Sequence, residues 1–229
     1  MRISFLIPAY NEAATIEEVL DRVDALDFDK QIVVVDDGSV DGTADIVERW
    51  RAGRKNVVLV RQPNQGKGAA IRTAIRQIDG DIAVIQDADL EYDPSDVPSL
   101  IEPIRTGAAD VVYGSRLSGG KPQRAYMFWH LVGNRFLSLM TNVLYNTTLS
   151  DMETGYKAFR AEVLLSLDLH QDCFAIEPEI TAKVTKRKLR VYEVPISYYG
   201  RTYDEGKKIT WRDGFKALAV LLQVRLSAS

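Results

Sequence analysis

The sequence predicts an α/β fold with a Rossmann-like, mostly parallel sheet that carries helices on both faces. The first observation behind this prediction is the regular alternation of short apolar runs with helix-like stretches through the first half of the chain. The second is that these runs are apolar almost throughout, as in strands that are buried on both sides. The third is that each run is followed by polar, acidic or glycine-rich residues. In open α/β sheets, ligands bind beyond the carboxyl ends of the strands.

The alternating half contains the expected strands and the helices that connect them. The strands are the apolar runs Ile3–Ile7, Ile32–Val35, Val57–Val60, Ile82–Ile85 and Val111–Tyr113. The helices between them are Thr15–Leu26, Gly42–Trp50, Gly66–Ile78 and Ser95–Arg105. Thr15 with Glu18 three residues later predicts a capping box at the start of the first helix.

The second half of the chain has a different pattern. Helices are expected at "RAYMFWHLVGNRFLSLMTNVLYN", "CFAIEPEITAKVTKRK" and "WRDGFKALAVLLQVRL", and a strand that leads into a loop at "LRVYEVPISYYGR". No linker rich in Pro, Gly or Ser, no internal repeat and no low-complexity segment interrupts the sequence. We therefore expect a single domain over residues 1–229, with a nucleotide-binding half at 1–116 and an acceptor-binding half at 117–229.

Composition excludes several classes of protein. With 46% hydrophobic and 27% charged residues, the chain is ordinary for a soluble globular protein. A net charge of −3 provides no basic field for nucleic acid. The single cysteine, Cys173, excludes a disulfide within the chain, favours a reducing compartment and is expected in the core. Pro8 interrupts the apolar start, so no signal peptide is expected, and no run of about 18 apolar residues predicts a membrane span.

Chemically distinctive segments follow the expected strands. They are "PAYNE" (Pro8–Glu12), "DDGSVDGT" (Asp36–Thr43), "RQPNQGKGAA" (Arg61–Ala70), "QDADLE" (Gln86–Glu91) and "GSR" (Gly114–Arg116). Each one alone has a structural explanation, such as a turn or the start of a helix. Together at one edge of the sheet they predict a binding site. The site is neither a P-loop nor a dinucleotide fingerprint, because the glycine spacing of both motifs is absent.

The acids of "QDADLE" predict a metal site. Asp87 and Asp89 are two residues apart on an extended chain, so their side chains point roughly the same way. Mg²⁺ and Mn²⁺ prefer oxygen ligands, and Mg²⁺ usually keeps substrate phosphates in its shell. We therefore expect this pair to hold a cation against a diphosphate. The alternative is that acids after a strand only cap the next helix, which we expect of Asp93 and Asp96 around Pro94.

Taken in order, these segments resemble a known family. "PAYNE", "VVDDGSVDGT", "NQGKGAA", "DADLE" and "GSR" match the motifs of family 2 glycosyltransferases, which have the GT-A fold. "GNRFLSLMTNVLYNTTLSDMETGYKAFR", "YEVPISY" and "RTYDEGK" are similar to the branch of dolichol-phosphate mannose synthases and other polyprenyl-phosphate glycosyltransferases. The resemblance covers nearly the whole chain. It implies metal-dependent, inverting transfer of a sugar from a nucleoside diphosphate sugar, of the GDP-mannose or UDP-glucose type, to a polyprenyl phosphate.

The resemblance also implies roles for individual residues. The residues that match the family's nucleoside pocket are Pro8, Tyr10, Glu12, Val35 and Asp37. Those that match its metal–diphosphate motif are Asp87, Ala88 and Asp89, with Glu91 as the third metal position. The cations that match its phosphate-binding groups are Arg116, Arg201 and Lys207. Many mannose synthases have Gln where this chain has Glu91, so the resemblance leaves the donor sugar open.

A polyprenyl phosphate acceptor changes what the site requires. An alcohol acceptor needs a general base, whereas a phosphate oxygen is already anionic and needs cations that offset its charge. His130 is expected to join the three phosphate-binding cations, with a packed aromatic-like role as the alternative. Glu177 and Glu179 are expected either near the site or on a solvated face. Asp151 in "SDMETG" is a candidate base or a residue that orients a cation, with a purely structural role as the alternative. The expected catalytic residues are Asp89, Asp151 and Arg116.

The segment Tyr126–Tyr145 is expected to lie at a membrane surface, because a polyprenol tail stays in the bilayer. Its polar residues recur every four positions, which places them on one helical face, and apolar residues fill much of the rest. These polar residues are His130, Asn134, Ser138 and Asn142. The pattern predicts an interfacial helix; the alternative is a core helix whose polar stripe faces the active site.

The end of the chain supports the same expectation. The final helix is apolar but too short to span a bilayer. Basic residues near it that attract anionic headgroups are Arg201, Lys207, Lys208 and Arg212. We expect a peripheral protein at the cytoplasmic face of the membrane, either with a membrane-protein partner or as a homo-oligomer. The loop Gly200–Trp211 is expected to be mobile and to close over the bound phosphates.

Three other functions remain open from the sequence. A family 2 enzyme with a soluble saccharide or protein acceptor would share all the donor motifs. A sugar nucleotidyltransferase would normally have a glycine-rich loop after the first strand, where this chain has "PAYNE". A non-catalytic nucleotide-sugar binder is disfavoured by the intact pair of Asp87 and Asp89.

Overall fold

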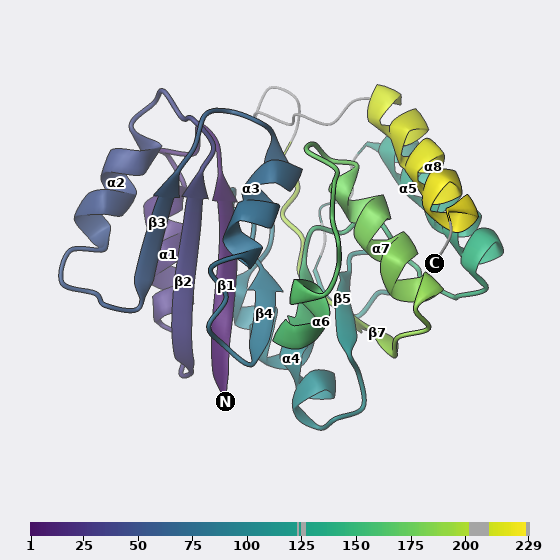
Figure 1. Ribbon diagram of the computed structural model, residues 1–229, viewed down its shortest axis with the longest axis horizontal. Helices are drawn as coiled ribbons and strands as arrows, with labels where there is room; N and C mark the ends of the chain where they lie inside the picture. Colours follow the sequence, from purple (N-terminus) through teal and green to yellow (C-terminus); the bar gives the residue numbers. More distant parts are fainter. Residues whose placement is uncertain (123, 125–126, 202–210, 228–229) are drawn as a thin grey trace.

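The described part of the chain contains one seven-stranded sheet (Figure 1). The computed structural model describes residues 1–122, 124, 127–201 and 211–227, the last segment without the side chains of 211 and 212. The strands are β1 (Arg2–Ala9), β2 (Asp29–Asp36), β3 (Val57–Arg61), β4 (Ile82–Ile85), β5 (Val111–Ser115), β6 (Lys157–Arg160) and β7 (Val191–Pro195). Their order is β3-β2-β1-β4-β6-β5-β7, and only β6 runs antiparallel to its neighbours. The predicted strands and the mostly parallel sheet are confirmed.

Helices cover both faces of this sheet and build a hydrophobic core on each. The helices on one face are α1 (Ile16–Asp24), α2 (Thr43–Trp50) and α4 (Val97–Arg105). Those on the other face are α3 (Lys67–Ile75), α6 (Ala161–Leu165) and α7 (Ile176–Lys186). Successive strand residues point to opposite faces, so Val34 packs in the first core, whereas Val33 and Val35 pack in the second.

Two further helices extend the molecule beyond the sheet. α5 (Phe128–Tyr145) and α8 (Trp211–Leu226) pack on each other and on α7, around a small core that includes Met152 and Leu221. The helices predicted for these segments are confirmed. Within the described residues, no helix combines the length and the apolarity needed to cross a bilayer.

Strand β6 was not predicted. It enters the sheet between β4 and β5, where Ala158 pairs with Val84 on one side and with Val112 on the other. The strand has only four residues, and it begins with Lys157, which is fully buried. A run this short, with a charged residue at a core position, gives no periodic signal in the sequence. Its place is determined by the two neighbouring strands.

Two local predictions are wrong. Thr15 precedes α1, but its side chain makes no capping bond; the hydroxyl donates to the carbonyl of Ala88 at 2.8 Å instead. This bond fixes the start of α1 to the acidic motif after β4. Cys173 is exposed, not part of the core, because it lies in the loop before α7.

The two acids expected to cap a helix after β4 have different roles. Asp93 precedes the short 3₁₀ helix Pro94–Asp96 and accepts a hydrogen bond from the backbone N–H of Ser95 at 2.9 Å. Asp96 makes no capping bond with its side chain, which accepts from the backbone N–H of Ser197 at 2.6 Å. The first acid therefore caps, as predicted, and the second joins α4 to the segment after β7.

The glycines at the start of α3 allow a close approach between two segments. Gly66 has a φ of +101°, and a Cβ there would lie 2.6 Å from the carbonyl oxygen of Asp172. A Cβ on Gly68 would lie 2.2 Å from the carbonyl oxygen of Gln171. The loop before α7 therefore packs directly on the "GKG" turn, which only glycine permits.

Candidate active site

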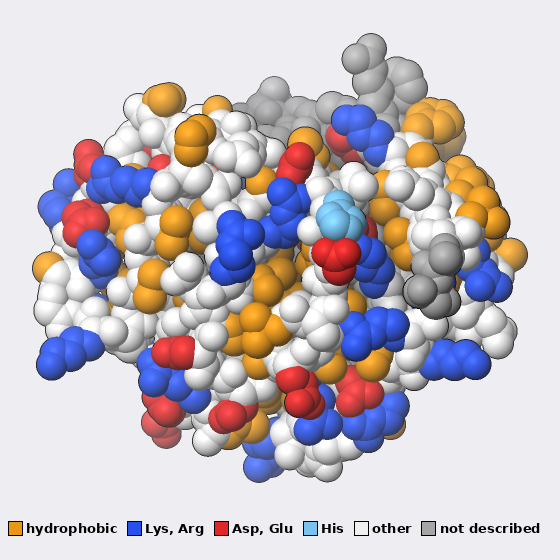
Figure 2. Space-filling view, in the orientation of Figure 1, with side chains coloured by type: hydrophobic (Ala, Val, Ile, Leu, Met, Phe, Trp, Pro, Cys, Tyr) orange, Lys and Arg blue, Asp and Glu red, His pale blue; other side chains and the backbone are white. Residues whose placement is uncertain are grey.

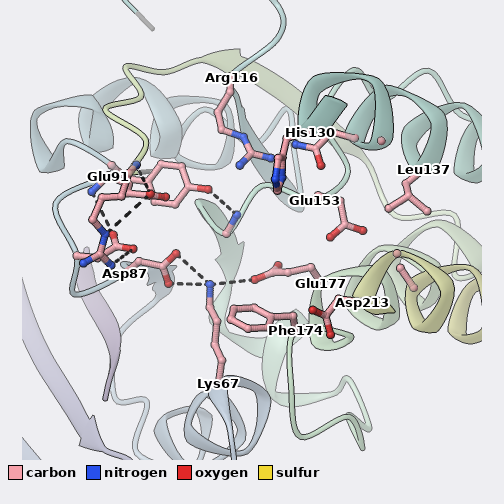
Figure 3. Close-up of a pocket in the computed structure, with 18 of the residues that line it drawn as sticks. Lys67, Asp87, Glu91, Arg116, His130, Leu137, Glu153, Phe174, Glu177 and Asp213 are labelled. Carbon is pink, nitrogen blue, oxygen red and sulfur yellow. Dashed lines mark hydrogen bonds and ion pairs between the residues drawn. The ribbon is translucent and has the colours of Figure 1, made fainter. Parts of the chain in front are cut away.

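A cavity of about 890 Å³ lies at the carboxyl ends of the parallel strands, where the sequence predicts a ligand site (Figure 3). Its walls come from segments that follow β1, β2, β3, β4, β5 and β7, and from α5, α7 and α8. The predicted site residues that line it are Pro8, Tyr10, Glu12, Asp37, Asp87, Ala88, Asp89, Glu91, Arg116, His130 and Arg201. Lys207 lies outside the described residues. Segments spread over most of the sequence thus meet in one place.

Val35 does not line this cavity. It is fully buried in the core between the sheet and the helices α3, α6 and α7. Because side chains alternate along β2, the side chain of Val35 points into that core rather than toward a nucleoside. Its predicted place in the nucleoside pocket is therefore not supported by the orientation of its side chain.

Asp37 fixes the turn that leads into α3. Its Oδ1 accepts from the side-chain amide of Gln62 at 2.7 Å and from the backbone N–H of Gln65 at 3.0 Å. Its Oδ2 accepts from the backbone N–H of Gly66 at 2.7 Å. Charge-assisted bonds of this kind are strong and directional. Asp37 therefore joins the segment after β2 to the "NQGKG" turn, and a contact with the nucleoside stays a prediction.

Each aspartate of "DAD" faces a cation of the protein. Lys67 Nζ lies 2.8 Å and 2.9 Å from the two carboxylate oxygens of Asp87. Arg201 Nη2 lies 2.9 Å from Oδ2 of Asp89. Gly155 packs against the first of these pairs, since a Cβ there would lie 2.7 Å from Asp87 Oδ2. Both carboxylates are thus held at the cavity wall by ion pairs that a ligand can exchange.

The aspartate pair fits a divalent cation. Burial, with the neighbouring charges of Asp87 and Glu91, raises the pKa of Asp89 to about 7. Arg201 lowers this pKa but does not outweigh burial and repulsion, so further positive charge would stabilise the ionised carboxylate. Carboxylate oxygens are the donors that Mg²⁺ and Mn²⁺ prefer. Asp87 and Asp89 would hold such an ion, and phosphate oxygens of a donor would complete its coordination.

Glu91 is occupied by other contacts. Its Oε2 accepts from the hydroxyl of Tyr198 at 2.9 Å, and its Oε1 accepts from the backbone N–H of Arg201 at 2.6 Å. No three acidic, histidine or cysteine side chains converge as a metal cluster in the part of the chain that the structure describes. Glu91 therefore joins the segment after β7 to the acidic motif, and its role as a third metal ligand stays a prediction.

Arg201 connects two of the predicted motifs. Besides Asp89, its guanidinium binds both carboxylate oxygens of Glu12 in "PAYNE", each at 3.1 Å. A single cation thus bridges the segments after β1 and β4, beside the expected position of the diphosphate. The predicted contact between Arg201 and the donor phosphates stays a prediction.

Arg116 and Asp151 form a buried, bidentate ion pair. The guanidinium donates from Nε to Oδ2 and from Nη2 to Oδ1, each at 2.7 Å, and the backbone N–H of Arg116 adds a bond of 3.0 Å to Oδ2. Asp151 is fully buried and does not line the cavity, whereas Arg116 does. The geometry therefore favours the role of Asp151 in orienting Arg116 over a role as a base.

Two lysines of the site were not predicted. Lys67, paired with Asp87, also lies 3.5 Å from Oε1 of Glu177, whose Oε2 binds the buried Lys157. Negative and positive side chains thus alternate from Asp87 at the cavity wall to Lys157 in the interior. The position of Lys67 between two glycines at the sheet edge is the one signal in the sequence that points to it. Lys157 has none, because only the fold brings it to a glutamate on α7.

The polar stripe of α5 faces inward, as one of the two predictions for this helix required. His130 and Asn134 line the cavity. Asn142 donates to the carbonyl of Leu149 and accepts from its N–H, both at 2.9 Å. The stripe therefore lines the site and positions the loop that follows α5.

Glu179, on α7, lies outside the cavity lining. Its side chain accepts from the backbone N–H of a residue in the preceding loop at 3.0 Å.

The fold and this site define a nucleotide-sugar transferase of the GT-A type: a Rossmann-like sheet with an aspartate pair and cations at its carboxyl edge. The chain belongs to glycosyl transferase family 2, whose model matches residues 4–167. The protein is therefore a glycosyltransferase. The predicted family and fold are confirmed.

Similar proteins extend this result. The chain is 29% identical over 242 residues to the UDP-N-acetylglucosamine–dolichyl-phosphate N-acetylglucosaminyltransferase of Methanococcus voltae, covering 98% of this chain and 96% of that one. It is 33% identical over 211 residues to the dolichol-phosphate mannosyltransferase of Pyrococcus furiosus, covering 90% of this chain but only 59% of the relative. Glucosyl-3-phosphoglycerate synthase from Mycobacterium tuberculosis, solved with Mn²⁺, UDP and phosphoglyceric acid, matches 100% of this chain and 80% of its own, with a TM-score of 0.74 and 25% identity.

Proposed function

We propose that the protein transfers a sugar, with inversion, from a nucleoside diphosphate sugar to a polyprenyl phosphate at the cytoplasmic surface of a membrane. The observation that carries this proposal is the shape of the cavity. It begins at the aspartate pair and continues between α5 and α8. The apolar residues that line this second part are Met127, Trp129, Leu131, Phe136, Leu137, Phe215, Ala217 and Leu218. A charged site that continues into an apolar groove suits an acceptor with a phosphate head and a hydrocarbon chain.

The outer faces of the same two helices suit a membrane surface. Along α5, exposed apolar side chains recur every three or four residues, which places them on one face. They are Phe128, Trp129, Val132, Phe136, Leu139 and Val143. α8 adds Phe215, Leu222 and Leu226, and Figure 2 shows hydrophobic side chains gathered over α8. Contiguous exposed apolar faces are typical of interaction sites, including membrane surfaces. The groove between α5 and α8 connects these exposed side chains to the active site.

The residues of the site would bind and orient the two phosphate groups. Arg201 and Lys67 would contact the donor diphosphate once the aspartates bind a divalent ion. That ion would offset the negative charge of the leaving diphosphate. Arg116, held by Asp151, would face the acceptor phosphate, and the apolar groove would exclude water, which competes for the sugar carbon.

A soluble acceptor is the second candidate function. The glucosyl-3-phosphoglycerate synthase with the same fold was solved with phosphoglyceric acid, a small phosphorylated acid. The cations of the present site suit such a molecule as well as they suit a lipid phosphate. The apolar groove is what separates the two, since a small anion has no use for it.

Replacing Trp129 and Phe136 together with serine tests the proposal. The two side chains are 79% and 51% exposed, so the free energy of unfolding is expected to change little. Binding to vesicles is expected to fall at least about tenfold, because each lost aromatic removes roughly 1 kcal/mol or more of apolar burial. Transfer to a long polyprenyl phosphate in vesicles should fall with it, while transfer to a short, water-soluble prenyl phosphate should change less.

Vesicle flotation and the two transfer assays check this expectation. Tyr192→Ser is the matched control, since that aromatic is 48% exposed on β7, away from the groove, and its replacement should leave vesicle binding unchanged. Equal losses with the long and the short acceptor, or unchanged vesicle binding in the double variant, would contradict the proposed groove.

A further inference from the structure

Glu153 is a half-buried residue of the cavity wall to which no role has been assigned. It belongs to the segment after α5 and lines the cavity between Arg116 and Glu177 (Figure 3). Its Oε1 is inaccessible to solvent and has no hydrogen-bond partner within the described residues. A buried polar atom without a partner is costly, so it requires an explanation from function or from a bound ligand.

Oε1 of Glu177 is also buried without a hydrogen bond in the described part of the chain, but Glu177 and the other carboxylates of the site each have a cation partner. Asp87 pairs with Lys67, Asp89 with Arg201, and Asp151 with Arg116. Glu177 pairs with Lys157. Glu153 makes no salt bridge in the part of the chain that the structure describes, and no dashed line reaches it in Figure 3. Glu153 is therefore a carboxylate of the cavity lining without a cation partner among the described residues.

The backbone on both sides of Glu153 is fixed. Two residues earlier, Asp151 is bound to Arg116, the cation proposed for the acceptor phosphate. Two residues later, Gly155 packs against Asp87 and donates its N–H to the hydroxyl of Tyr92 at 3.0 Å. Glu153 thus belongs to a short segment that is fixed at one end to the proposed acceptor-binding cation and at the other to the aspartate pair. The reacting groups would meet in the cavity that this segment lines.

A phosphate acceptor that enters as the monoanion carries a proton that must leave during the reaction. A phosphate monoester has a second pKa of about 6, so near neutral pH it exists as both the monoanion and the dianion. The monoanion approaches a diphosphate with less repulsion than the dianion does. Its remaining proton must then leave as the new bond forms, because the phosphodiester product is a strong acid. A nearby base therefore assists an acceptor that enters as the monoanion.

We propose that Glu153 accepts this proton from the acceptor phosphate as the phosphate oxygen attacks the sugar. The inference rests on the proposed function. In this step the bond between the phosphate oxygen and the anomeric carbon forms, and the bond from that carbon to the diphosphate breaks. The bonding electrons leave with the diphosphate, and the proton of the acceptor moves to the carboxylate of Glu153. No oxidant or other reactant is needed.

The electrostatic surroundings suit a group that exchanges a proton near neutral pH. Burial raises the pKa of Glu153 to about 7, Glu177 and Asp151 raise it as well, and Lys157 and Arg116 act in the opposite direction. Charged or titratable residues elsewhere in the cavity lining include Lys67 on α3, Asp87 after β4, His130 on α5 and Asp213 on α8 (Figure 3). A base works best when its pKa is close to the operating pH.

The test compares wild type with Glu153→Gln across pH 6 to 9, using polyprenyl phosphate in vesicles. The nucleotide sugars are GDP-mannose, UDP-glucose and UDP-N-acetylglucosamine. At pH 7 the variant is expected to lose roughly 100-fold in transfer rate, the usual contribution of a general base. The glutamine has the same shape and replaces an oxygen without a partner, so the thermal midpoint and donor affinity should stay the same.

The ratio of wild-type to variant rate carries the decisive information. The variant has no base, so it depends on the acceptor dianion. Below pH 7 the ratio should be constant, because falling pH removes ionised Glu153 from the wild type as steeply as it removes the acceptor dianion from the variant. Above pH 7 Glu153 is fully ionised, and the ratio should fall about tenfold for each pH unit as the monoanion disappears. Recovery of the variant toward wild-type rates at pH 9 is thus the predicted signature.

Other roles for Glu153 give other results. If it only binds hydroxyl groups of the sugar, the ratio stays level or rises with pH, and donor affinity falls; either result overturns the proposal. A purely structural role lowers the thermal midpoint and gives a loss that does not depend on pH, which also overturns it. Glu162→Gln on α6 is the control, since this exposed carboxylate lies outside the cavity lining.

Two safeguards keep the result interpretable. If Glu153→Gln does not fold, Glu153→Met replaces it with an unbranched apolar chain of similar length, and the same dependence of the ratio on pH is expected. If the wild type transfers no sugar to polyprenyl phosphate at any pH, the proposed function has failed. If the wild type is active and the ratio does not fall above pH 7, only the role of Glu153 is rejected.

Discussion

Replacing Asp89 with alanine is expected to lower the rate of sugar transfer by at least about 100-fold. The loss follows from the position of Asp89 beside Asp87, where the pair would hold the divalent ion that offsets charge on the leaving diphosphate. The free energy of unfolding should change by no more than about 1 kcal/mol. Asp89 is buried near the like charges of Asp87 and Glu91, so its removal relieves repulsion while it costs the contact with Arg201.

Transfer assays and thermal unfolding of the same preparation check this expectation. Asp93→Asn is the matched control, because Asp93 belongs to the same acidic segment but caps a 3₁₀ helix with its side chain. Asparagine retains that cap, and transfer should remain near the wild-type rate. Near-normal transfer by Asp89→Ala, or by the wild type in excess EDTA, would remove the metal from the account.

Replacing Arg116 with alanine is expected to reduce both stability and transfer. The change leaves Asp151 fully buried without its bidentate partner, which typically costs about 3–5 kcal/mol in the free energy of unfolding. Transfer should fall further than the folded fraction explains, because the proposed contact with the acceptor phosphate is lost. Chemical denaturation and transfer per folded molecule separate the two effects.

A double variant separates the two roles of Arg116. Arg116→Gln combined with Asp151→Asn removes both charges and retains hydrogen-bonding groups, so most of the lost stability should return. Transfer should stay low, since the charge of Arg116 no longer faces the acceptor phosphate. If stability and transfer recover together, Arg116 has only a structural role, and the acceptor phosphate must be bound by other residues.

The sheet and the location of the site could be predicted because both depend on short, local patterns. Apolar runs predict buried strands, and parallel strands place the residues that follow them at one edge. This is why Asp37, Asp87, Asp89 and Arg116 meet, although almost 80 residues separate the first from the last. The antiparallel β6 could not be found in this way, since its neighbours, and not its own four residues, determine its place.

The pairing of charges could not be predicted from the sequence. Asp151 was a candidate base, but the fold places Arg116, from the end of β5, against both of its oxygens. Glu153, only two residues further along, instead has a buried oxygen without a partner among the described residues. Neighbouring acids in one loop thus differ in chemistry because of what the fold places opposite each of them. A sequence pattern carries no information about such long-range partners.

Helix α5 has features that both of the competing predictions for it required. Its polar stripe was assigned either to an interfacial helix or to a core helix that faces the site. In the structure, His130 and Asn134 line the cavity, while Val132 and Leu139 are exposed outside its lining. A helix has enough faces to contribute to the active site and to present an apolar surface at the same time.

The most direct test of this account measures which acceptor receives the sugar. The protein is incubated with Mg²⁺ and a labelled nucleotide sugar, in turn with vesicles that contain polyprenyl phosphate, with plain vesicles, and with phosphoglyceric acid in solution. After extraction with organic solvent, the label should be found in the organic phase only when polyprenyl phosphate and the divalent ion are both present. Labelled phosphoglyceric acid with no labelled lipid would contradict the account, because the apolar groove between α5 and α8 would then have no acceptor chain to bind.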